Sequence, residues 1–102
     1  MEKHAPKFGD SIAAMRRKKR IKQKEFAKSL YINPSYLSTL ERGGRNPNIK
    51  LLYKMAVQLE IAFEDFMLEL IRPQFPENQE TDLLFKQSRP IIKKCLQVLV
   101  TF

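Results

Sequence analysis

The sequence has a single cysteine, three glycines and no tryptophan among its 102 residues. One cysteine cannot close an internal disulfide, which excludes a small secreted fold stapled by disulfides and suits a reducing compartment. No apolar run approaches the ~18 residues that a membrane span requires, and residues 1–10 lack the apolar segment of a signal peptide. We therefore expect a cytoplasmic protein that does not enter the membrane.

Positive charge is concentrated in the first half of the chain. Residues 1–54 contain 14 lysines and arginines against 4 aspartates and glutamates, whereas residues 55–102 contain 5 against 7. The whole chain has a net charge of +8. A basic half favours a polyanionic partner, nucleic acid first and an anionic membrane second. Basic residues also simply keep a helix face solvated, so charge alone leaves both interpretations open.

Apolar residues recur at helical spacing, and no segment alternates in the way a β-strand does. Asn33-Pro34 is typical of a helix start, Asn48 is a further N-cap candidate, and Gly43-Gly44 is typical of a helix end. On the first segment, Phe8 is expected to join Ile12 and Met15 on the buried face. The pattern predicts an all-α fold with five short helices, at residues 8–20, 23–30, 34–42, 49–59 and 63–71.

Prolines interrupt the pattern after residue 71. Pro73 and Pro76 predict that the fifth helix ends there and that residues 73–81 form a polar linker. Pro90 then opens a last apolar stretch, in which Cys95 is expected to be a buried, inert thiol. Such a stripe cannot remain exposed, so it either folds back on the domain or joins two subunits. Its members are Ile91, Ile92, Cys95, Leu96, Leu99 and Phe102.

The second and third predicted helices are about three residues apart, which is the spacing of a helix-turn-helix. The third helix buries Leu37 and Leu40, and its other face offers small hydrogen-bonding groups, one aromatic ring and one cation. A major groove presents donors, acceptors and thymine methyl groups that such side chains can read. The amide ends of both helices can also hold phosphates. The groups on this face are Ser35, Tyr36, Ser38, Thr39 and Arg42.

Three stretches resemble the Cro/repressor (XRE) helix-turn-helix family: Gln23-Lys-Glu-Phe-Ala27, Asn33-Pro-Ser-Tyr-Leu-Ser-Thr-Leu-Glu-Arg-Gly43 and Arg45-Asn-Pro47. The resemblance covers roughly residues 8–68. It implies a five-helix, lambda-repressor-like DNA-binding domain with a C-terminal helical extension. We accordingly divide the chain into a flexible N-terminal tail, the DNA-binding domain, and a linker with a helical extension that is expected to dimerise, at residues 1–7, 8–71 and 72–102.

The resemblance also implies roles for single residues. Gln23 matches a family glutamine that binds a phosphate and braces the recognition helix. Arg16 matches an arginine that pairs with the glutamate at Glu41, so we interpret this ion pair as structural. The positions that face bases or nearby phosphates are Ser35, Tyr36 and Thr39, with Ser38 beside them. The other expected DNA-binding residues are Lys22, Asn33, Arg42, Arg45, Asn46 and Asn48.

Three positions depart from the family pattern. Arg20 and Tyr31 stand where the family has glycines, the first ending a helix and the second making the turn with a positive φ. A left-handed conformation costs a residue such as Tyr31 ~1–2 kcal/mol. Lys22 stands where the family has a serine or threonine cap, whose loss costs ~1 kcal/mol. Our hypothesis is that Arg20 and Lys22 exchange stability for phosphate contact.

These patterns predict a sequence-specific transcriptional regulator of double-stranded DNA, a repressor by default. One helix-turn-helix reads about half a site, so we expect a homodimer on a near-palindromic operator, joined through residues 63–71, residues 82–102 or both. Two alternatives stay open: an antitoxin or restriction-modification controller, the former with a toxin as partner, and a protein-docking module without DNA binding. Neither a catalytic set nor a metal-ligand cluster occurs, so no catalytic residue, metal, cofactor or enzymatic activity is expected.

Overall fold

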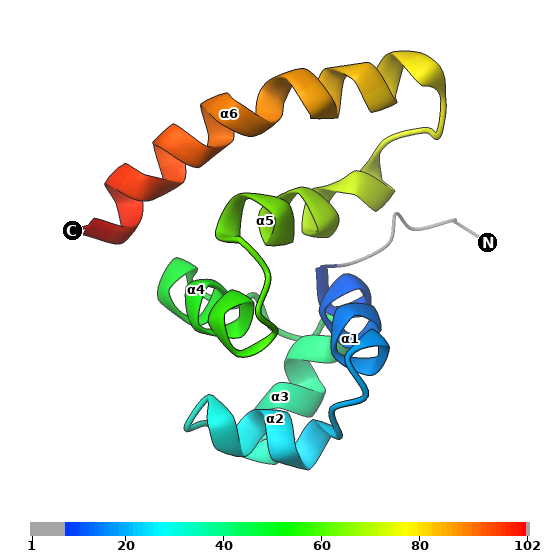
Figure 1. The fold of residues 1–102 in the computed structure, drawn as a ribbon. Helices are drawn as coiled ribbons and strands as arrows, with labels where there is room; N and C mark the ends of the chain where they lie inside the picture. The colour runs from blue at the N-terminus through cyan, green and yellow to red at the C-terminus, as the bar shows by residue number, and fades with distance from the viewer. Residues whose placement is uncertain (1–7, 102) are drawn as a thin grey trace.

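The computed structural model describes residues 8–101, with side chains described for residues 8–98. The predicted tail at residues 1–7 and Phe102 lie outside the described residues, as does the side chain of Leu99. Within residues 8–101 the structure contains helices and no strand, which confirms the all-α fold class. The elements are α1 (Phe8–Lys18), α2 (Gln23–Ser29), α3 (Pro34–Glu41), α4 (Ile49–Gln58), α5 (Phe63–Ile71), a 3-10 turn η1 (Arg72–Gln74) and α6 (Gln79–Thr101) (Figure 1).

The first five helices share one apolar core. Phe8 was expected in this core, but it is 40% exposed. At the next residue the backbones of α1 and α3 pack closely, because a Cβ added at Gly9 would lie 2.2 Å from the carbonyl oxygen of Leu40. The other residues expected on the buried faces of these helices, Ile12, Met15, Leu37 and Leu40, are buried. The core residues are Ile12, Met15, Phe26, Ala27, Leu30, Leu37, Leu40, Leu51, Leu52, Met55, Ala56, Leu59, Phe66 and Leu70.

Four helices end with the same backbone geometry. The second residue after α3 is Gly43, with a φ of 82°. The equivalent residues after α1, α2 and α4 are Arg20, Tyr31 and Glu60, with φ of 59°, 57° and 57°. The next residue in each case donates its N–H to the carbonyl five positions earlier, as Ile32 does at 3.0 Å after α2. This is the Schellman arrangement. The positive φ expected at Tyr31 is confirmed, and the one at Glu60 was not anticipated.

The C-terminal extension begins earlier than predicted. A linker at residues 73–81 and a helix opening at Pro90 were expected, but α6 starts at Gln79 and contains Pro90 in its interior. The sequence supplied a better start, because the Oδ1 of Asn78 accepts a hydrogen bond from the N–H of Thr81 at 2.8 Å. An interior proline removes one helical hydrogen bond and bends a helix. Figure 1 shows α6 bowed over α5.

Ion pairs and aromatic contacts hold α6 in place. Arg89 donates to Asp65 twice, from Nε to Oδ1 at 2.7 Å and from Nη2 to Oδ2 at 3.1 Å. Arg72 pairs with Asp82, and its guanidinium lies 5.0 Å from the centre of the Phe85 ring. The extension therefore folds back on α5, which was one of its two predicted arrangements.

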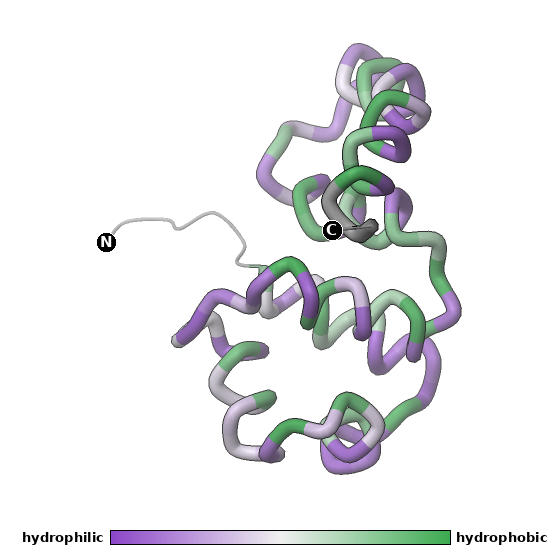
Figure 2. The backbone as a smooth tube through the Cα atoms, turned by 90° about the vertical axis from the view of Figure 1, so that its left-hand side faces the viewer, coloured by the Kyte–Doolittle hydropathy of each residue, from purple (hydrophilic) through white to green (hydrophobic). Residues whose placement is uncertain are grey.

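The helices divide between two ends of the molecule. Figures 1 and 2 both place α5 and α6 at one end and α2 and α3 at the other, with α1 and α4 between them. None of the helices in the described range combines the length and the apolarity needed to cross a bilayer. Cys95 was expected to be buried, but it is exposed on α6. The helical stripe that contains Cys95 is wider than the face that α5 covers.

Candidate nucleic-acid interface

The C-terminal end of α3 is anchored by a buried carboxylate. Glu41 accepts hydrogen bonds from Arg16, at 2.7 Å from Nε to Oε2 and at 3.0 Å from Nη2 to Oε1. Arg16 and Glu41 are 7% and 6% exposed. Gln23 donates from Nε2 to the same Oε1 at 2.9 Å, and Arg16 donates from Nη1 to the Ile21 carbonyl at 2.8 Å. The two charges can be buried because they are paired and hydrogen-bonded. The carboxylate of Glu41 on α3 thereby links this helix to Arg16 on α1 and to Gln23 on α2.

The N-terminal end of α3 is set by a side-chain cap. Asn33 accepts the N–H of Ser35 at 2.8 Å, and Pro34 occupies the first helical turn. Asn48 caps α4 in the same way, accepting the N–H of Leu51 at 2.8 Å. Both asparagines belong to the expected DNA-binding set and are exposed. Each keeps an amide nitrogen with two hydrogens that can donate to a further acceptor.

Leu37 and Leu40 face the core and are 0% exposed, which turns the polar side of α3 outward. Arg42 donates to the hydroxyl of Ser38 at 2.6 Å, and the hydroxyl of Thr39 donates to the carbonyl of Ser35 at 3.0 Å. These contacts order the hydroxyl groups and leave each with acceptor capacity. The outward residues are exposed at Ser35 and Arg42, and half-buried at Tyr36, Ser38 and Thr39.

A loop with an arginine borders this face. The guanidinium carbon of Arg45 lies 5.9 Å from the centre of the Tyr36 ring, within the range of a cation–π contact. The loop continues through Asn46 and Asn48, which are exposed. The structure therefore brings Arg45 to the edge of α3 and leaves Asn46 and Asn48 exposed on the same loop.

On its other side, the polar face of α3 opens into a hollow of about 600 Å³. Ser38 and Arg42 line the hollow together with Gln23 of α2 and Arg17 of α1. Arg17 was not in the predicted set, which took two other residues of the same basic run, Arg16 as a structural ion-pair partner and Arg20 as a phosphate contact. Neighbouring residues on a helix point about 100° apart, so the burial of Arg16 against α3 directs Arg17 to this rim.

Lys22 stands apart from these clusters. It occupies the N-cap position of α2 and is exposed, and in the described chain its side chain makes no capping hydrogen bond to that helix. This agrees with the expected loss of a cap. Among the described residues, no three histidine, cysteine, aspartate or glutamate side chains gather into a possible metal site. The candidate interface is thus polar and mostly cationic, built from hydroxyl, amide and guanidinium groups, with the carboxylate of Asp10 at the hollow beside α3.

Comparison with known proteins agrees with this architecture. A family model described as helix-turn-helix matches residues 12–66, which run from α1 into α5. A protein of Sinorhizobium fredii, described as an uncharacterized HTH-type transcriptional regulator, is 37% identical over 65 residues. That match covers 64% of this chain and 79% of the relative. The region matched by the family model includes α2, α3 and the Arg16–Glu41 pair.

Proposed function

Because the chain belongs to the helix-turn-helix family, we propose that it is a transcriptional regulator that binds double-stranded DNA sequence-specifically, with α3 as its recognition helix. One observation carries the proposal: the polar face of α3 is held outward by a buried carboxylate at one end and by an asparagine cap at the other. A helix fixed at both ends presents its side chains in one orientation, as base recognition in a major groove requires. The basic half of the chain supplies attraction to the phosphates.

The interface residues divide into two classes of contact. Base reading is assigned to the α3 residues Ser35, Tyr36, Ser38 and Thr39. Phosphate contact is assigned to Gln23, whose amide nitrogen keeps a second hydrogen after one is donated to Glu41. Phosphate contacts position a protein, and base contacts specify the sequence. The further phosphate-binding residues are Arg17, Lys22, Asn33, Arg42, Arg45, Asn46 and Asn48.

A single α3 spans only about half of a typical operator, so the proposal includes a homodimer on a near-palindromic site. The two recognition helices would enter successive major grooves about 34 Å apart. Such a dimer represses by covering a site that polymerase needs, and it acts in the cytoplasm. An antitoxin or a restriction-modification controller would use the same DNA face. Co-purification of a toxin with the chain would identify the antitoxin.

Selection from a random duplex library at two salt concentrations tests the proposal. Enrichment of a two-fold symmetric site, with affinity that falls steeply as salt rises, is the expected result. Salt-sensitive binding without an enriched sequence would contradict base reading by α3. Absence of any duplex binding would overturn the proposal in favour of the docking module.

Two matched substitutions separate the classes of contact. Arg45→Ala should weaken binding to all sequences alike and reduce the salt slope by about one. Thr39→Ala should instead relax the preference at one base position, by ~1–3 kcal/mol if Thr39 contacts that base. Lys86→Ala serves as the control, because it removes a charge of the same sign from α6, at the end of the molecule away from α3 (Figure 1).

Lys22→Ser tests whether the absent cap is linked to DNA contact. Serine should cap α2 and raise stability by ~1 kcal/mol. Loss of the ammonium group should lower the salt dependence of DNA binding by about one phosphate contact. Urea unfolding and binding at several salt concentrations measure the two effects, and an unchanged salt slope would exclude the phosphate contact.

A further inference from the structure

The helix α6 carries an exposed apolar stripe in addition to the face that packs on α5. Leu84 and Ile91 are 56% and 65% exposed, and Cys95 is exposed beside them. Along this side of α6, uncharged residues recur at sequence spacings of four and three in alternation, at positions 84, 88, 91, 95 and 98. This spacing is the repeat along which two helices pack side by side. The stripe, defined here as Leu84, Ile91 and Cys95, therefore fits another helix.

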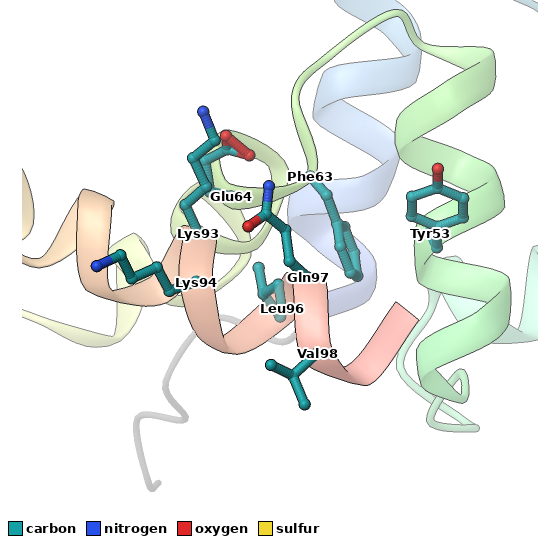
Figure 3. Close-up of a pocket in the computed structure, with 8 residues that line it drawn as sticks. All are labelled: Tyr53, Phe63, Glu64, Lys93, Lys94, Leu96, Gln97 and Val98. Atoms are coloured by element: carbon teal, nitrogen blue, oxygen red, sulfur yellow. The ribbon is translucent and has the colours of Figure 1, made fainter. Parts of the chain in front are cut away.

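The stripe differs from the face that covers α5. At 100° per residue, its three members lie within about 40° of one another, and their centre is about 90° from that of Phe85 and Ile92. Phe85 and Ile92 are half-buried, and Leu96 on the same side is only 8% exposed. Figure 3 shows Lys94, Leu96 and Val98 leaving α6 on different sides, next to a groove of about 760 Å³. The stripe and the side that faces α5 together form an apolar arc wider than α5 covers, which indicates a second partner for α6.

The charges along one edge of the stripe indicate what that partner is. Glu80 and Lys94 are two seven-residue repeats apart, so they flank the stripe on the same edge, and both are exposed. In an antiparallel pair of identical helices the same edges meet with their ends exchanged, so Glu80 of each copy meets Lys94 of the other. The same register places Leu84 beside Ile91 of the other copy. A parallel pair would instead place Lys94 of one copy level with Lys94 of the other, and Glu80 level with Glu80, so the opposite charges would not meet.

We propose that α6 pairs antiparallel with α6 of a second copy of the chain along this stripe, centred near Gln87. The proposal rests on the homodimer of the proposed function and assigns its interface to α6. The helix has 23 residues and thus runs for about 34 Å, long enough for several turns of side-by-side packing. The position of α6, at the far end from α2 and α3, keeps both recognition faces clear of the interface (Figure 1).

Sedimentation of the full chain, with a matched pair of substitutions, tests the interface. Leu84→Glu should raise the dimer dissociation constant by ~100-fold or more, because two carboxylates would enter an apolar seam. Leu83→Glu is the control, since Leu83 is 54% exposed on the same helix but lies off the stripe. Both sites are exposed, so both variants should fold, which circular dichroism checks. A dimer equally stable in both variants would overturn the proposal.

Cross-linking of the unmodified chain tests the direction of pairing. In the antiparallel register the two Cys95 residues lie about 24 Å apart along the axis, far beyond disulfide reach. Mild oxidation should leave the natural chain uncross-linked and should cross-link the double variant Gln87→Cys, Cys95→Ser. A rapid Cys95 disulfide would establish parallel pairing and refute the antiparallel one. Cross-linking of neither protein would refute pairing through α6.

Charge reversal gives an independent signature. Glu80→Lys and Lys94→Glu should each weaken the dimer by roughly tenfold, and the double reversal should restore it. Library selection keeps this result separate from DNA binding. A symmetric site enriched by a dimer that survives Leu84→Glu would leave the proposed function intact and refute the α6 interface. A dimer that Leu84→Glu disrupts, without any enriched DNA site, would support the α6 interface and refute the proposed function.

Discussion

Replacing Tyr31 by glycine should stabilise the domain, although it removes a large side chain. The backbone at Tyr31 has a φ of 57°, and the residue is 91% exposed. A left-handed conformation costs a non-glycine residue ~1–2 kcal/mol. Glycine removes that cost but makes the unfolded chain more flexible, which lowers the free energy of unfolding by ~0.4–1 kcal/mol. Almost no packing is lost, so the net gain in the free energy of unfolding is ~0.5–1 kcal/mol.

Urea unfolding followed by circular dichroism measures this gain. The midpoint should rise with an unchanged slope, and the melting temperature should rise by ~3–6 °C for a domain of this size. Tyr31→Ala is the control, because it removes the ring and keeps the Cβ that causes the strain. An alanine variant as stable as the glycine variant would refute the backbone explanation. Glu60→Gly repeats the test at a second helix end, and the two gains should add.

Three further substitutions probe packing and charge. Glu41→Ala should lower the free energy of unfolding by ~3–5 kcal/mol, because the buried guanidinium of Arg16 is left unpaired; a loss under 1 kcal/mol in urea would contradict that burial. Gly9→Ala should lower it by ~1–3 kcal/mol in the same assay, because the new methyl group meets carbonyl groups of α3, and an unchanged midpoint would show that α1 shifts freely. The hydrogen bond from the guanidinium of Arg89 on α6 holds the pKa of Asp65 below its ordinary value of about 3.8. The charged carboxylate of Asp65 therefore stabilises the fold fully at pH values above about 3.8, and this stabilisation disappears as the pH falls through the lower pKa of the folded state. Asp65→Asn should be less stable than the natural chain at pH 6, with a gap in the urea midpoint that closes in acid; a gap independent of pH would refute this.

The sequence patterns that located the helices are local ones. Periodic apolar residues marked five segments, and Asn33 and Asn48 marked helix starts because their side chains can cap only the helix that follows. The Arg16–Glu41 pair connects α1 with α3 and became predictable only through family resemblance. The outward direction of Arg17 depends on how α1 packs, so the basic run did not identify it.

The extension could not be predicted from local rules for a physical reason. Proline suits the first turn of a helix, so Pro90 indicated a start, but the cap at Asn78 and packing on α5 outweigh one absent hydrogen bond. Periodicity also shows how wide an apolar arc is without showing which part a neighbour covers. Cys95 was therefore expected to be buried, although it lies on the part that α5 leaves exposed. Glu60 was missed because a left-handed helix end was expected only at glycine or at a family glycine position.

The separation of charge along the molecule has a consequence for encounter with a polyanion. Residues 1–54 hold 14 basic and 4 acidic side chains, whereas residues 55–102 hold 5 and 7. Residues 8–54 form α1–α3 and the start of α4, and the second half of the chain forms the rest of α4 together with α5 and α6 at the opposite end. The end of the molecule that holds α2 and α3 is therefore more positive than the end that holds α5 and α6. In the DNA complex proposed above, the field of a duplex would turn α3 forward before contact, so a larger share of collisions would begin in the productive orientation.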